Sequence, residues 1–215
     1  MFKVIKKFLD IDRKDKIVFF LTCSMIGNIL MAVLKFVMAV SIPSFWFFIN
    51  SGFSLVLGMS KILTIKCYKK VKNIKDKNER IKEEYKNYTI NGVMLMLLGI
   101  VYFFVSSYMY YNGTNTTMHE YVTYLVALIA FTSIGNAIYG MIKYKRNYEP
   151  IIKGIKITNF ANALTSIVLT QVVLLDTYAK GYDSTLNGYT GMGVSIIIII
   201  LGLSMVSTCK KDNIV

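Results

Sequence analysis

Six long, mostly apolar runs constrain this chain more than any other feature of its sequence. A helix rises 1.5 Å per residue, so about 20 residues cross the roughly 30 Å of hydrocarbon in a bilayer. Because water does not reach the backbone there, each run must pair its own N–H and C=O groups, which a helix does. The sequence therefore predicts an all-α, six-helix transmembrane bundle with spans at residues 17–40, 45–65, 92–110, 121–142, 157–175 and 190–208.

The composition supports a membrane protein and argues against a nucleic-acid binder. Charged residues make up 17% of the chain and apolar types 54%, whereas a soluble domain carries about a quarter charged residues. The net charge of +13 does not indicate nucleic acid, because the basic residues flank apolar spans and no domain is large enough to present them to a duplex. We interpret them as topology signals.

The basic residues fall almost entirely on one side of the predicted bundle. Of the 25 lysines and arginines, 23 lie in the N-terminal segment 1–16, around the loops after the second and fourth spans, or in the tail 209–215; only Lys35 and Lys180 do not. Short loops rich in Lys and Arg stay cytoplasmic. We therefore expect both termini in the cytoplasm, a transmembrane domain over 17–208, and a multi-pass protein of the cell membrane. The Lys- and Ile-rich composition is typical of bacteria and favours a bacterial plasma membrane.

The basic segment 66–91 has two interpretations. Its Val71, Ile74, Ile81 and Tyr85 recur near helical spacing among Lys and Glu, which fits a cytoplasmic extension of a neighbouring span. Alternatively, it is a surface helix attracted to anionic lipid. The candidate partners are thus the bilayer, anionic lipid at the basic cytoplasmic face and a second copy of the chain, with no nucleic acid.

Polar side chains are distributed unevenly among the spans. They form helical stripes on spans one, two, four and five, as with Thr132 and Asn136 on the fourth, whereas 93–105 and 196–201 carry almost none. Because polar groups in hydrocarbon should face other helices or water, we expect a core of four helices with the third and sixth spans outside it. On the sixth span, small residues at Gly191, Ser195 and Gly202 predict close helix packing.

The striped residues are either hydrogen-bonding contacts between helices or the lining of a solute path. Lys35 stands apart, because an unpaired ammonium costs about 3 kcal/mol in a membrane helix, so it is expected to pair, to function, or to reach toward the outer surface along its stem. The residues predicted to line a transport path are Asn28, Lys35, Asn50, Ser54, Asn136, Thr158 and Asn162.

These residues carry a family resemblance. The pattern Asn28…Lys35…Asn50-Ser51…Ser54, followed by Asn136 and by the segment 162–166, resembles the cation diffusion facilitator (cation efflux) family. It is most similar to uncharacterised bacterial six-span membrane proteins that resemble the transmembrane domain of that family. The resemblance implies six spans, cytoplasmic termini, and a core of spans one, two, four and five.

The chain departs from the family at the metal site. Family members place two acidic or His ligands on the second span and a His-x-x-x-Asp pair on the fifth, a set that suits tetrahedral Zn²⁺. The corresponding residues here are all neutral, and neutral oxygens bind Zn²⁺ poorly. We therefore expect no metal site and no cofactor at these four positions: Asn50, Ser54, Thr158 and Asn162.

The sequence contains no recognisable enzyme constellation. His119 is the single histidine, and there is no paired-carboxylate site, phosphate loop or activated nucleophile. The chain is therefore not expected to be an enzyme. Two functions remain: a cation-efflux-like transporter of unknown substrate that lacks the usual zinc site, or a non-transporting membrane scaffold or regulatory protein.

Overall fold

The computed structural model describes residues 13–41, 45–113, 119–143, 149–179 and 185–212. Every element in these ranges is an α-helix, and the six helices are long and apolar enough to cross a membrane. The predicted all-α, six-helix fold is confirmed, and the chain is a multi-pass membrane protein. The helices are α2 (Arg13–Ser41), α3 (Phe45–Lys72), α4 (Lys77–Asn112), α5 (Glu120–Lys143), α6 (Pro150–Tyr178) and α7 (Thr185–Asp212).

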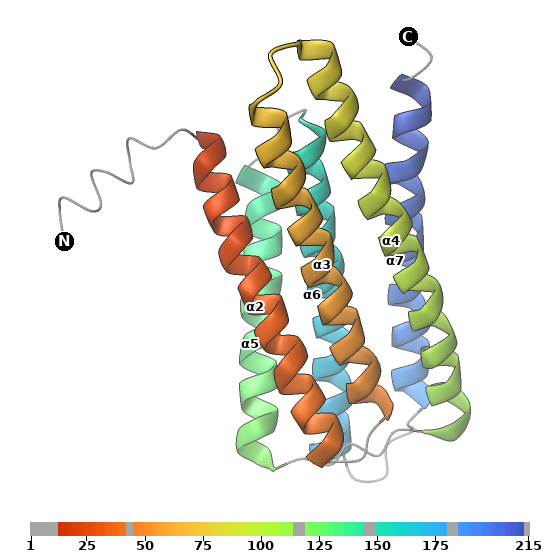
Figure 1. The fold of residues 1–215 in the computed structure, drawn as a ribbon. Coiled ribbons are helices and arrows are strands. Elements are labelled where there is room, and N and C mark those ends of the chain that lie inside the picture. The colour runs from red at the N-terminus through yellow and green to blue at the C-terminus, as the bar shows by residue number, and fades with distance from the viewer. Residues whose placement is uncertain (1–12, 42–44, 114–118, 144–148, 180–184, 213–215) are drawn as a thin grey trace, which may run out of the picture.

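The helices pack most extensively in three pairs: α2 with α3, α5 with α6, and α4 with α7 (Figure 1). Helices α3 and α6 contact each other in the middle, with α2 packed on α3 and α5 packed on α6. Helices α4 and α7 pack extensively on each other and cover the opposite side of the α3–α6 pair. Among the described residues, the main hydrophobic core is formed mostly by α3, α4, α6 and α7, with one buried residue each from α2 and α5. This corrects the expected core of the first, second, fourth and fifth spans: the third and sixth helices belong to the core, and α2 and α5 flank it.

Large apolar side chains cover the outward faces of the bundle. Phe104 of α4 and Phe131 of α5 each leave about two thirds of their surface exposed, at 69% and 66%, and Ile200 of α7 is similarly exposed. In a soluble protein such faces would be a liability. Against lipid they need no further covering, so they fit helices that cross a membrane.

An aromatic cluster joins α3 to α4. The Tyr102 ring of α4 lies 5.2 Å from the Trp46 ring and 5.6 Å from the Phe53 ring of α3, measured between centroids. All three side chains are buried, and tilted aromatic contacts of this kind add to the gain from packing. This cluster fixes how α4 sits against α3.

Glycines bring the backbones of α4 and α7 into close contact. A Cβ atom placed on Gly202 would lie only 2.7 Å from the carbonyl oxygen of Gly92, and one placed on Gly99 would lie 3.2 Å from the carbonyl oxygen of Ser195. Only residues without a side chain fit at such an approach. The small-residue stripe predicted on the sixth span therefore does face another helix.

The basic segment 66–91 is not a separate element. Its first part ends α3, its last part begins α4, and a turn at 73–76 joins them. The Asp76 side chain accepts a hydrogen bond from the backbone N–H of Asn78 and so caps α4. An ion pair between Lys70 Nζ and Glu83 Oε1, 2.9 Å apart, connects the two helices.

The third helix carries buried polar residues that the sequence interpretation passed over, because they precede its apolar stretch. Asn91 Oδ1 accepts from Ser60 Oγ at 2.8 Å, and Asn91 Nδ2 donates to Thr64 Oγ1 at 2.9 Å and to Asn87 Oδ1 at 3.2 Å. Each of these side chains is buried and bonded. The network is interhelical packing in which the amide of Asn91 is fully used.

We predict that Gly202→Ala destabilises the protein by about 1–3 kcal/mol, the usual cost of overpacking, because the new methyl group would meet the backbone of α4. The matched control is Gly193→Ala on the same helix, where a Cβ would meet nothing within 4 Å. Both changes bring the same gain in helix propensity. Unfolding by denaturing detergent should separate them, and equal stability of the two variants would contradict the close packing.

Candidate functional site

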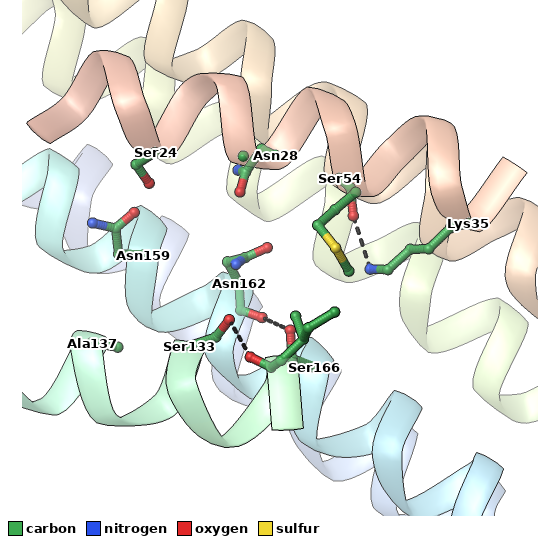
Figure 2. A pocket seen from close by; sticks show the side chains of 12 residues that line it. Ser24, Asn28, Lys35, Ser54, Ser133, Ala137, Asn159, Asn162 and Ser166 are labelled. Atoms are coloured by element: carbon green, nitrogen blue, oxygen red, sulfur yellow. Dashed lines mark hydrogen bonds between the residues drawn. The ribbon is translucent and has the colours of Figure 1, made fainter. Parts of the chain in front are cut away.

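A cavity of about 290 Å³ lies between α2, α3, α5 and α6. Every one of these four helices contributes side chains to its wall (Figure 2). Most of the lining is polar or small, at a depth where the surrounding helix faces are apolar. The lining residues are Ser24, Gly27, Asn28, Met31, Lys35, Ser54, Ile129, Ser133, Ala137, Asn159, Asn162 and Ser166.

Helix periodicity places the α2 residues on one face. Residues 24, 28, 31 and 35 are spaced by four, three and four, which aligns them along one side of a helix. Asn28 is buried, with 7% of its surface exposed, and its Nδ2 atom has no hydrogen-bond partner among the described residues. The amide oxygen of Asn28 points toward the cavity in Figure 2, whereas its Nδ2 is enclosed by the protein, so Asn28 offers the cavity an acceptor.

Lys35 is held inside the helix group. Its ammonium donates a 2.9 Å hydrogen bond to Ser54 Oγ of α3, and Ser54 in turn donates to the carbonyl oxygen of Asn50 at 3.0 Å. Only 5% of the lysine is exposed. Lys35 therefore pairs across the α2–α3 interface and does not extend to the membrane surface.

A second lysine lies buried on the same interface. Lys61 Nζ of α3 donates a 2.6 Å hydrogen bond to Ser24 Oγ of α2, and 2% of Lys61 is exposed. Lys61 lies within the predicted second span, 45–65, although it was also counted among the basic residues around the loop that follows, and the structure places it within α3. Ser24 and Lys35 are about 16 Å apart along α2 at 1.5 Å per residue, so one ammonium lies near each end of the α2 wall.

The opposite wall comes from α5 and α6. Ser133 Oγ donates to the carbonyl oxygen of Ile129 at 2.9 Å, and Ser166 Oγ donates to the carbonyl oxygen of Asn162 at 2.9 Å, which leaves both serine oxygens as acceptors. The side-chain amides of Asn159 and Asn162 make no hydrogen bond to any other side chain that the structure describes. Figure 2 shows both amides beside the cavity.

The chemistry of this lining favours polar or anionic ligands over divalent cations. The lining contains one ammonium, three amides and four hydroxyls, and no Asp, Glu, His or Cys. Nor does any group of three such residues elsewhere in the described chain suit a metal ion. Zn²⁺ prefers thiolate, imidazole and carboxylate donors, so these walls do not fit it.

The structure brings together four of the seven residues predicted to line a path, namely Asn28, Lys35, Ser54 and Asn162. Asn50 is buried but turns away, and its Nδ2 donates to the carbonyl oxygen of Trp46 at 3.0 Å. Thr158 is buried and donates to the carbonyl oxygen of Gly154 at 2.9 Å. Neither lines the cavity. The side chain of Asn136 lies outside the described residues.

Sequence reasoning missed part of the wall. Ser133 was overlooked in favour of Thr132, which the structure leaves exposed on the outer side of α5. Adjacent helix positions differ by about 100°, so a shift of one residue moves a stripe to another face. On α6, Asn159 and Ser166 face the cavity with Asn162, while Thr158 and Thr165 pack against neighbouring helices.

Comparisons with known proteins do not assign a family: no family model matches the chain, and no curated protein matches it significantly. The resemblance to cation diffusion facilitators stays a prediction.

We predict that Ser54→Ala costs about 1–3 kcal/mol of stability, because it leaves the buried Lys35 ammonium without its acceptor. Lys35→Met combined with Ser54→Ala should cost less than Ser54→Ala alone, since both partners are then apolar. A double-mutant cycle read from detergent unfolding measures the coupling. Strictly additive effects would mean that the Lys35–Ser54 hydrogen bond is not formed.

Proposed function

We propose that this chain is a membrane transport protein in which a small polar solute passes between α2, α3, α5 and α6. The observation that carries the proposal is the set of unused amides at the cavity. Asn159 and Asn162 make no side-chain hydrogen bond within the described part of the chain, and the Nδ2 atom of Asn28 is buried without a partner. A solute or water in the cavity would satisfy the amides of Asn159 and Asn162.

The α3–α4 network provides the contrast. There Asn91 uses its amide oxygen once and its amide nitrogen twice, as expected of a side chain whose role is to join helices. The amides of Asn159 and Asn162 are not bonded in this way among the described residues. A buried amide oxygen without a partner also occurs away from the cavity, at Asn50. A polar group in hydrocarbon is costly when unpaired, so the unused amides support a cavity that holds a polar guest.

The arrangement of helices also supports a transporter. The cation efflux resemblance implies a path among the first, second, fourth and fifth spans, and the cavity lies between the same helices, α2, α3, α5 and α6. The cargo differs from Zn²⁺ in this proposal, because the described lining carries an ammonium and no carboxylate. The concentration of Lys and Arg at one end of the bundle supports cytoplasmic termini.

The test is solute flux into vesicles that contain the purified protein. We expect flux above protein-free vesicles for at least one of methanesulfonate, octanesulfonate, glycerol and Rb⁺, and none for Zn²⁺. Ser133→Leu should abolish it by filling the cavity. The matched control is Thr132→Leu, which removes a hydroxyl bonded to the same Ile129 carbonyl oxygen but faces outward; its flux should equal that of the wild type.

Background flux of all five solutes would contradict transport and favour the alternative, a non-transporting scaffold or regulatory protein. Equal loss of flux in the Thr132 and Ser133 variants would show that the path does not follow this cavity.

A further inference from the structure

We infer that the solute is an amphiphilic anion, with its charged head in the polar cavity and its apolar body in an adjoining apolar cavity. This inference rests on the proposed function, since it names the class of solute that the four-helix group would accept.

A second cavity of about 250 Å³ continues from the first. It lies toward the C-terminal end of α2 and the N-terminal end of α5. Its lining is almost entirely apolar, with Leu34, Phe47, Leu125 and Leu169 among its residues. The two cavities share four lining residues, Met31, Lys35, Ile129 and Ser166. Together they form one space with a polar end and an apolar end.

Lys35 stands where the two cavities meet. An ammonium has three N–H donors, and Lys35 uses one of them on Ser54 among the described residues. Two donors remain for a ligand at the junction. The two free N–H donors of the Lys35 ammonium suit the oxygens of an anionic head.

Electrostatics favours the same head group. Lys35 and Lys61 are both buried, and each is bonded to a neutral serine hydroxyl rather than to a carboxylate. A charge in a medium of low dielectric is stabilised by a nearby opposite charge. The walls supply none among their described residues, so a bound anion would provide the missing counter-charge.

The apolar cavity is open to the bilayer. Leu34, Val37 and Leu125 line it and are also exposed on the lipid-facing surface, Leu125 at 55%. Helices α2 and α5 flank the opening, and their described residues share no extended contact. An amphiphile can thus reach the site from the membrane between these two helices.

The volume of the apolar cavity is enough for one alkyl chain. At roughly 30 Å³ for a group the size of water, the apolar cavity holds about eight methylene groups. A single straight chain of that length with one anionic head would fit the two cavities. Octanesulfonate is a suitable probe, because its head stays ionised.

The test is equilibrium binding of labelled octanesulfonate to the full chain in lipid nanodiscs, corrected with empty nanodiscs. We expect methanesulfonate, which lacks the chain, and octyltrimethylammonium, which reverses the charge, to compete at least tenfold more weakly. Lys35→Met should weaken octanesulfonate binding at least tenfold. The control Lys66→Met, exposed at the end of α3, should leave it unchanged.

A second pair of variants tests the apolar cavity. Leu125→Trp should weaken octanesulfonate at least tenfold and leave methanesulfonate unchanged. The control Leu128→Trp, also on α5 and 63% exposed but outside both linings, should behave as wild type. Equal affinity for the cationic and anionic probes would overturn the inference, and so would unchanged binding in Lys35→Met or a co-purified phospholipid that excess octanesulfonate does not displace.

The binding test and the flux test can fail independently of each other. Selective binding of octanesulfonate without flux of any solute would uphold this inference and contradict transport. Flux of glycerol or Rb⁺ that depends on Ser133, with no octanesulfonate binding, would uphold transport and overturn the anionic cargo.

Discussion

The reciprocal lysine–serine contacts between α2 and α3 are the interaction on which the site depends. Lys35 of α2 donates to Ser54 of α3, and Lys61 of α3 donates to Ser24 of α2. Each ammonium is thereby kept inside the helix group instead of reaching water along its stem. Because both contacts cross the same interface, they fix how α2 is rotated on α3. That rotation turns Asn28 toward α5 and α6 and gives the cavity its positive wall.

The packing of α4 and α7 supports the helices that line the cavity. Close packing of α4 and α7 at glycines, and the Trp46–Tyr102 contact, hold α3 and α6 from one side. Helices α2 and α5 then need few contacts with each other, so a cavity can persist between them. The rigid side of the bundle and its open side are therefore built from different residues: small and aromatic residues pack the first, and amides, hydroxyls and an ammonium line the second.

Much of the fold was predictable from the sequence, because an apolar run of 20 residues in a bilayer satisfies its backbone hydrogen bonds by forming a helix. The polar stripes predicted which four helices line the cavity, but not that α4 and α7 belong to the hydrophobic core. The site was predicted only in part, since the rotation of each helix is set by its neighbours. Thr132 and Ser133 offer the same hydroxyl, and only packing decides which one faces inward. The contact between Lys61 and Ser24 was not predicted, because the two residues are distant in sequence.

The most direct test measures whether the cavity admits hydrophilic reagents and prefers anions. Asn162→Cys, in a chain whose three cysteines are replaced by serine, places a thiol on the cavity wall. We expect it to react with a sulfonate-bearing methanethiosulfonate at least tenfold faster than with a trimethylammonium-bearing one, after correction for their rates with a free thiol. Adding Lys35→Met should reduce this preference. No reaction with either reagent, or a faster reaction with the cationic one, would contradict a positively charged cavity open to polar solutes.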